Sequence, residues 1–119
     1  MEYEFGQMII PNSDKKYLAI IFKEKKLEIL SAFLFSEVRS HSGIDVLECI
    51  DKVLMGKLKS NEFHGNVYGI EISPDKTRVV DDLADDGEGN WCEIDTKELR
   101  NIVKIWYKKL LEFEKTQTL

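Results

Sequence analysis

Cysteine is scarce in this 119-residue chain, which holds only Cys49 and Cys92, far apart and in no CxxC or zinc-finger spacing. Isolated thiols of this kind are typical of the reducing cytoplasm, where disulfides are rare. A domain of this size buries roughly two-thirds of the surface that its unfolded chain exposes, so its core needs no covalent or metal support. The composition therefore predicts no disulfide, no metal site and no cofactor.

Proline and glycine are sparse as well, at two and seven residues, and the chain has no Ser/Gly-rich linker and no internal repeat. These absences predict a single domain over residues 1–119. No apolar run approaches the roughly 20 residues that cross a bilayer. Glu2 and Glu4 stand where a secretory signal carries positive charge. We therefore expect a cytoplasmic protein that makes no contact with a membrane.

Positive charge is in deficit, because seventeen Lys and Arg oppose twenty-two Asp and Glu for a net charge of −5. This balance argues against direct binding of nucleic acid, whose phosphates require a basic surface. The enzyme signatures GxSxG, HExxH, GxGxxG and the P-loop are absent too. His41 and His64 are the two histidines, and a small hydrolase that uses His64 with a nearby carboxylate is left as an alternative. The expectation is a protein that is not an enzyme and has no catalytic residue.

The first third of the chain has a hydrophobic pattern that is typical of strands. Strands are predicted at Met1–Ile10, Lys16–Phe22 and Leu27–Phe35, and they would form a three-stranded meander. The third segment also fits a helical stripe through Leu27, Leu30, Leu34 and Val38. Its run of aromatic and short apolar residues favours the strand.

Later segments alternate between helical and strand periodicity. They predict a helix at Ile44–Met55, a hairpin of Val67–Ser73 and Thr77–Leu83, a short strand at Trp91–Cys92, and a final helix that ends at Glu114. Ser42 and Asp45 have capping-box spacing for the first helix, Gly56 suits its end, and Asp95 can cap the last one. The element order is βββ-α-ββ-(β)-α. It predicts an α+β fold with one antiparallel sheet of about five strands and two helices on one face.

Negative charge is concentrated late in the chain. Residues 1–60 carry nine acids and nine bases, whereas residues 61–119 carry thirteen acids and eight bases. Residues 81–95, which we call the acidic segment, hold seven acids and no Lys or Arg. These acids are Asp81, Asp82, Asp85, Asp86, Glu88, Glu93 and Asp95. Glycines within the segment favour a loop, and Trp91 adds a large aromatic side chain.

Three interpretations of the acidic segment remain open. The first is a solvated loop without a function. The second is a calcium loop, because four residues have the spacing of its positions 1, 5, 6 and 12. They are Asp82, Asp86, Gly87 and Glu93, although Ala84 stands where another ligand is required. The third is a docking surface for a basic protein, where carboxylates speed the encounter and Trp91 serves as a buried anchor. We favour the third.

The second half of the chain resembles the small immunity proteins of bacterial contact-dependent growth inhibition systems, which are encoded beside polymorphic toxins. The resemblance is carried by the hairpin at residues 67–80, the acidic turn at residues 85–89, and residues 94–99 leading into Ile105 and Trp106. It implies a non-enzymatic inhibitor that binds one toxin domain, usually a basic nuclease, and blocks its active site.

These arguments together predict a cytoplasmic monomer that binds one nuclease toxin, most simply an RNase, and presents the acidic segment to its basic cleft. No residue is carried over from the resemblance, so the contacts rest on charge reasoning. The residues that we predict to bind the toxin are Asp81, Asp82, Asp85, Asp86, Glu88, Trp91 and Glu93. A module that binds divalent cations and a small hydrolase are the alternatives.

Overall fold

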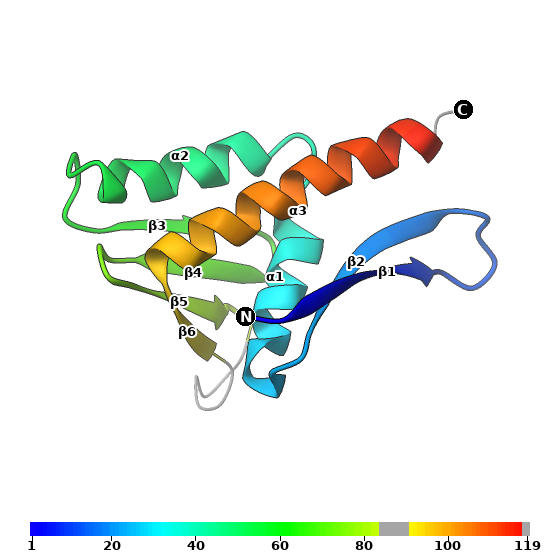
Figure 1. Ribbon diagram of the computed structural model, residues 1–119, viewed down its shortest axis with the longest axis horizontal. Coiled ribbons are helices and arrows are strands. Elements are labelled where there is room, and N and C mark those ends of the chain that lie inside the picture. Colours follow the sequence, from blue (N-terminus) through cyan, green and yellow to red (C-terminus); the bar gives the residue numbers. More distant parts are fainter. Residues whose placement is uncertain (84–90, 118–119) are drawn as a thin grey trace.

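The computed structural model describes residues 1–83 and 91–117 and has an α+β fold with antiparallel sheets (Figure 1). The elements are β1 (Tyr3–Ile9), β2 (Lys16–Phe22), a 3-10 turn η1 (Lys25–Leu27), α1 (Glu28–Glu37), α2 (Gly43–Leu54), β3 (Asn61–His64), β4 (Tyr68–Ile72), β5 (Lys76–Asp81), β6 (Trp91–Asp95) and α3 (Thr96–Gln117). Strands β1 and β2 form one sheet, and β3 to β6 form a second sheet in chain order. The predicted fold class is confirmed, although the described residues form two sheets and three helices instead of one sheet and two helices.

The strand predicted at Leu27–Phe35 is wrong, because most of this segment lies in α1. Leu27, Leu30, Leu34 and Val38 are all buried, so the helical stripe is the pattern that the fold uses. The Ser31 hydroxyl also donates a hydrogen bond to the Ile20 carbonyl of β2, which ties the helix to the preceding strand. The predicted meander is therefore a two-stranded hairpin followed by a helix.

Helix ends agree closely with the sequence patterns. Helix α2 begins after Ser42, as predicted, but the Ser42 hydroxyl accepts from the Arg39 amide and donates to the Glu37 carbonyl instead of capping the helix. Gly56 has a φ of 78°, which suits the residue that follows a helix. The Asp95 carboxylate accepts a hydrogen bond from the Lys97 amide at 3.0 Å. The predicted cap of the last helix is confirmed.

The predicted hairpin corresponds to β4 and β5, and the predicted short strand at Trp91–Cys92 to the start of β6. Strand β3 lies between the predicted helix at Ile44–Met55 and the predicted hairpin, and it was not predicted. Its four residues pair with β4, with His64 opposite Gly69 at the end of the ladder. Only Asn61 and Phe63 of β3 are half-buried, so the segment has too little apolar character to signal a strand.

One hydrophobic core fills the space between the four-stranded sheet, the three helices and β2. Trp106 of α3 is fully buried at its centre, and its indole Nε1–H donates to the Val38 carbonyl at 2.8 Å. Figure 1 shows α3 running past the sheet and on beside the β1–β2 hairpin. No helix in residues 1–83 or 91–117 is long and apolar enough to cross a bilayer.

Candidate functional site

The side of the four-stranded sheet that faces away from the helices is open and charged. Strand alternation sends Ile70, Ile72 and Val79 into the core and sends their neighbours outward. The outward residues form rows that cross the strands, and we call this surface the acidic sheet face. Its exposed residues are Glu62, His64, Glu71, Lys76, Arg78, Asp82, Trp91 and Glu93. Four exposed carboxylates, one guanidinium and one ammonium group thus share one side of the sheet.

One row crosses all four strands. Glu62 lies opposite Glu71, Glu71 opposite Arg78, and Arg78 opposite Glu93. Like charges directly opposite each other destabilise a sheet, so the Glu62–Glu71 pair works against the stability of the fold. Local conflicts of this kind occur where a protein meets a functional demand. The other two pairs in the row, Glu71–Arg78 and Arg78–Glu93, join opposite charges and favour the sheet, so the local conflict is confined to Glu62 and Glu71.

Trp91 and Arg78 form a preorganised unit on this face. The Arg78 guanidinium lies 4.4 Å from the centroid of the Trp91 ring, which is a cation–π distance. Trp91 nevertheless leaves 43% of its surface exposed. It also borders a groove of about 620 Å³ that it shares with Ile29, Ala32, Tyr68 and Asp81 and with the charged residues Lys25, Lys26 and Glu28. An exposed aromatic ring held in place beside a groove can anchor a bound protein with little loss of side-chain entropy.

His64 lies at the other end of the acidic sheet face, among carboxylates. Its Nδ1 is 2.8 Å from Asp82 Oδ2, and its Nε2 is 3.8 Å from Glu62 Oε1. The hydrogen bond to Asp82 raises the pKa of His64 above its ordinary value of 6.5. Gly69 lies beneath the pair, and a Cβ there would come within 2.3 Å of His64 Nδ1.

This pair bears on the hydrolase alternative, since a histidine beside a carboxylate is half of a nucleophile-activating triad. Within residues 1–83 and 91–117, the hydrogen-bond partner of the His64 ring is Asp82, and no hydroxyl or thiol is bonded to it. Cys92 belongs to the buried side of the sheet, and burial raises the pKa of its thiol to about 11. Among the described residues the His64–Asp82 pair thus has no nucleophile to activate. Its effect is on the local charge of the acidic sheet face.

Glu37 is a buried carboxylate that no sequence pattern marked as functional. It is only 6% exposed, and it accepts hydrogen bonds from the backbone amides of the turn between β3 and β4. Oε1 accepts from Asn66 at 3.0 Å, and Oε2 accepts from Val67 at 2.8 Å and Tyr68 at 2.7 Å. A Cβ on Gly65 would lie 2.2 Å from Oε1, so this turn closes over the carboxylate only with glycine there. Glu37 therefore holds the turn that follows His64.

The predicted toxin-binding residues divide between two surfaces. Asp82, Trp91 and Glu93 lie on the acidic sheet face, whereas Asp81 is half-buried, accepts a hydrogen bond from the Leu83 amide and lines the neighbouring groove. Three others, Asp85, Asp86 and Glu88, lie outside the described residues. So do Asp86 and Gly87 of the predicted calcium loop. The part of the chain that the structure describes holds no group of three or more side chains that could bind a metal.

Glu62, Glu71 and Arg78 join the site only through strand pairing. The one sequence signal for them is the alternation around Ile70 and Ile72, which points Glu71 outward. Glu62 belongs to the unpredicted strand β3, so its place opposite Glu71 follows from register alone.

Comparison with known proteins supplies the family. The chain is 36% identical over 115 residues to a Bacillus cereus (strain ATCC 14579) protein named "Immunity protein", and the match covers 97% of this chain and 94% of that protein. No protein-family model matches the chain, and no solved structure matches it significantly. Because identity above 30% extends over nearly the full length of both proteins, this chain belongs to the immunity proteins.

Proposed function

We propose that this chain neutralises a protein toxin by binding it in the cytoplasm, without chemistry of its own. The toxin is the one encoded beside it in a contact-dependent growth inhibition or related polymorphic toxin system. Membership of the immunity proteins supports the neutralising role. The finer proposal is that the toxin is a basic nuclease, most simply an RNase, and that one chain occupies the active-site cleft of one toxin domain.

The observation that carries this proposal is the acidic sheet face. Nucleases hold phosphate groups with Lys and Arg, and a surface of carboxylates competes for those side chains. Glu62, Glu71 and Glu93 are fixed on paired strands, so they meet a partner without the ordering cost of a loop. A sheet face that is open, acidic and rigid is suited to a cationic cleft.

Trp91 supplies the apolar part of the contact. Charges at the rim of an interface mainly speed association, whereas a buried aromatic anchor mainly slows dissociation. The groove beside Trp91 can take an apolar side chain from the toxin between Tyr68 and Ile29, while Lys25 and Lys26, which also line it, disfavour a basic one. The proposal thus assigns separate kinetic roles to the carboxylates and to Trp91.

Binding kinetics with the purified toxin domain encoded beside this chain test both roles. We expect Glu71→Gln with Glu93→Gln to slow association about tenfold at low salt and to flatten its salt dependence. Glu48→Gln with Glu112→Gln removes the same charge from exposed positions on α2 and α3 and serves as the control. If the two double variants slow association equally, the effect comes from the net charge of the chain and not from the acidic sheet face.

The proposed role of Trp91 as an anchor is tested by a separate pair of variants. Trp91→Ala is expected to raise the dissociation rate by at least tenfold, while Met55→Ala, at another exposed apolar residue, leaves it unchanged. Cleavage of RNA by the toxin should stop at one equivalent of the wild-type chain. A toxin that cleaves no nucleic acid contradicts the nuclease proposal. In that case the association and dissociation rates of the variants still test the binding surface.

A further inference from the structure

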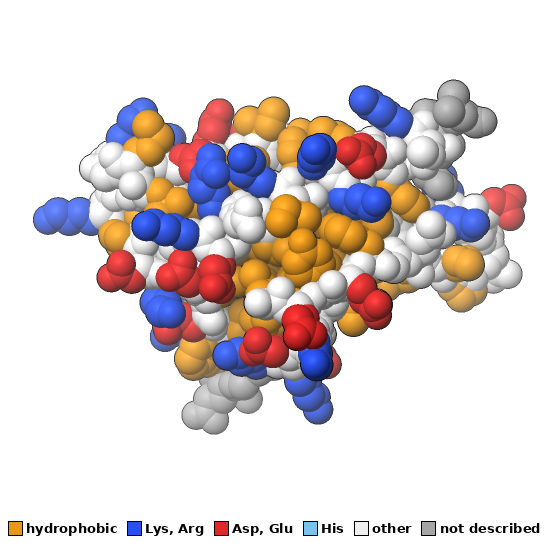
Figure 2. Space-filling model, in the orientation of Figure 1, with side chains coloured by type: hydrophobic (Ala, Val, Ile, Leu, Met, Phe, Trp, Pro, Cys, Tyr) orange, Lys and Arg blue, Asp and Glu red, His pale blue; other side chains and the backbone are white. Residues whose placement is uncertain are grey.

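The β1–β2 hairpin carries an unusual share of the exposed apolar surface. Among the described residues, eleven large apolar side chains are exposed, and six of them lie within the first 21 residues. These six are Met1, Tyr3, Met8, Ile9, Ile10 and Ile21. Figure 2 shows apolar side chains at the outer end of the hairpin, among charged ones. Three of them, Met8, Ile9 and Ile10, are consecutive at the end of β1, and exposed apolar surface often marks a binding site.

Strand β1 also has an unpaired edge. It pairs with β2 on one side, and no other strand in residues 1–83 or 91–117 pairs with it. It contains no proline and no lysine, the residues that usually block such edges. A two-stranded sheet is marginal by itself, and a further strand would stabilise it.

The hydrogen-bond pattern tells which backbone groups face the open edge. The Lys23 amide donates to the Glu2 carbonyl, so Glu2 and Lys23 form a hydrogen-bonded pair. Such pairs alternate along an antiparallel ladder. The amides and carbonyls of Tyr3, Phe5, Gln7 and Ile9 therefore point away from β2 and toward the edge.

We propose that β1 pairs antiparallel with β1 of a second copy of this chain, with Gly6 opposite Gly6 on the two-fold axis. Only this register pairs all four outward residues, Tyr3 with Ile9 and Phe5 with Gln7, in both directions. The result is one continuous four-stranded sheet across two chains. This proposal differs from the monomer that the sequence predicts.

Side-chain chemistry fits the same register. Tyr3 meets Ile9 as an aromatic–β-branched pair, which is favourable across strands. On the other side of the sheet Glu4 meets Met8 and Glu2 meets Ile10, so no like charges stand opposite each other. Gly6, with no side chain, meets its own copy where the two strands approach most closely.

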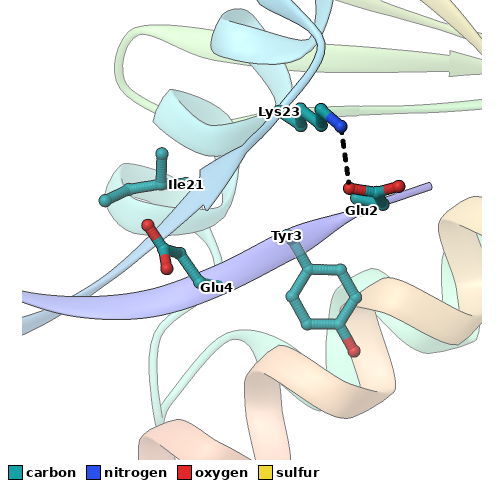
Figure 3. Close-up of a pocket in the computed structure, with 5 residues that line it drawn as sticks. All are labelled: Glu2, Tyr3, Glu4, Ile21 and Lys23. Atoms are coloured by element: carbon teal, nitrogen blue, oxygen red, sulfur yellow. Dashed lines mark ion pairs between the residues drawn. The ribbon is translucent and has the colours of Figure 1, made fainter.

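The surface at the N-terminal end of β1 carries a groove that the proposed register places beside the other chain. Figure 3 shows Tyr3 on one side of the strand and Glu4 and Ile21 on the other, with Glu2 paired to Lys23 at 3.3 Å. These five residues line a groove of about 290 Å³. The register places Met8 and Ile10 of the second copy directly beside it. The register thus brings the exposed tip of each chain beside the groove of the other, in one two-fold contact.

Sedimentation velocity over a range of concentrations tests the dimer. Gln7→Pro removes an amide that faces the open edge and leaves the β1–β2 hydrogen bonds intact. Ile9→Lys adds a charge at a side chain that is 66% exposed in a single chain. We expect each to raise the dissociation constant of the dimer at least tenfold. Ile44→Lys, at another exposed isoleucine on α2, should leave it unchanged.

Cysteine crosslinking tests the register in a Cys49→Ala background. Gly6→Cys should form a disulfide-linked dimer on oxidation, because the two Cα atoms on the axis lie within disulfide range. A Cβ at Gly6 meets only Ile21 Cδ1, at 3.5 Å, so the variant should fold. Met8→Cys is the control, because the register separates its two copies by several residues and should prevent the link.

Three results would overturn the proposal. One is a chain that sediments as a monomer up to millimolar concentration. Another is a dimer that Gln7→Pro and Ile9→Lys leave intact, or that crosslinks as readily through Met8→Cys as through Gly6→Cys. The third is a monomer whose toxin binding is weakened by Gln7→Pro, which would make the edge a toxin contact. Because the acidic sheet face is separate from β1, failure of the dimer would leave the proposed toxin surface unaffected.

Discussion

Removing the Glu37 carboxylate tests whether the β3–β4 turn is held from inside the fold. Glu37→Ala deprives the amides of Asn66, Val67 and Tyr68 of their acceptor. Asn66 is exposed, so water can replace the lost bond there, whereas Val67 and Tyr68 are half-buried. Each buried amide left unpaired costs about 1–3 kcal/mol, and two of them cost about 2–6 kcal/mol.

Part of that cost is offset, because the wild-type fold bears the desolvation of a buried charge and the variant does not. We therefore expect Glu37→Ala to lower the free energy of unfolding by about 3 kcal/mol. Glu37→Gln keeps the size of the side chain, and its amide oxygen can take the place of Oε2 and accept from Val67 and Tyr68, with its NH₂ group toward the exposed Asn66 amide. It should therefore lose clearly less stability than Glu37→Ala, which removes both bonds.

Urea unfolding measures the effect. With a slope of about 1–3 kcal/mol/M, a loss of 3 kcal/mol moves the midpoint down by about 1–3 M at an unchanged slope. Amide hydrogen exchange at residues 66–68 should accelerate more than exchange in α3. Glu48→Gln, at an exposed position on α2, is the control and should stay within about 0.5 kcal/mol of wild type. If Glu37→Ala loses less than about 1 kcal/mol, the carboxylate does not hold the turn.

Two further predictions follow from single contacts. The raised pKa of His64 means that its pair with Asp82 stabilises the fold fully below pH 6.5 and loses that contribution as pH rises through the raised value. An NMR titration should find the His64 pKa above 6.5 and lowered by Asp82→Asn, and an unchanged value would exclude the hydrogen bond as its cause. Gly43→Ala should cost about 1–3 kcal/mol in urea unfolding, despite the better helix propensity of alanine. The new Cβ would lie 2.2–2.8 Å from the Tyr107 ring, and an unchanged midpoint would mean that the ring moves aside freely.

The sequence determined those features that depend on neighbours along the chain. Helix α2 was predicted at Ile44–Met55 and lies at Gly43–Leu54, and the Asp95 cap stands where its spacing placed it. The β4–β5 hairpin followed from alternation around Pro74 and Asp75. Periodicity and capping act within a turn of helix or a pair of strands, so a single chain segment contains the whole signal.

Tertiary structure decided what depends on residues far apart in the chain. The segment at Leu27–Phe35 fitted both periods, and burial against β2 and the sheet selected the helix. Strand β3 exists because β4 offers it an edge, and that pairing alone brings Glu62 opposite Glu71. Glu37 reaches amides about thirty residues away, a contact that no local pattern encodes. The acidic composition was thus readable from the sequence, whereas the surface that presents it arose from strand register, because register sets which side chains share a face.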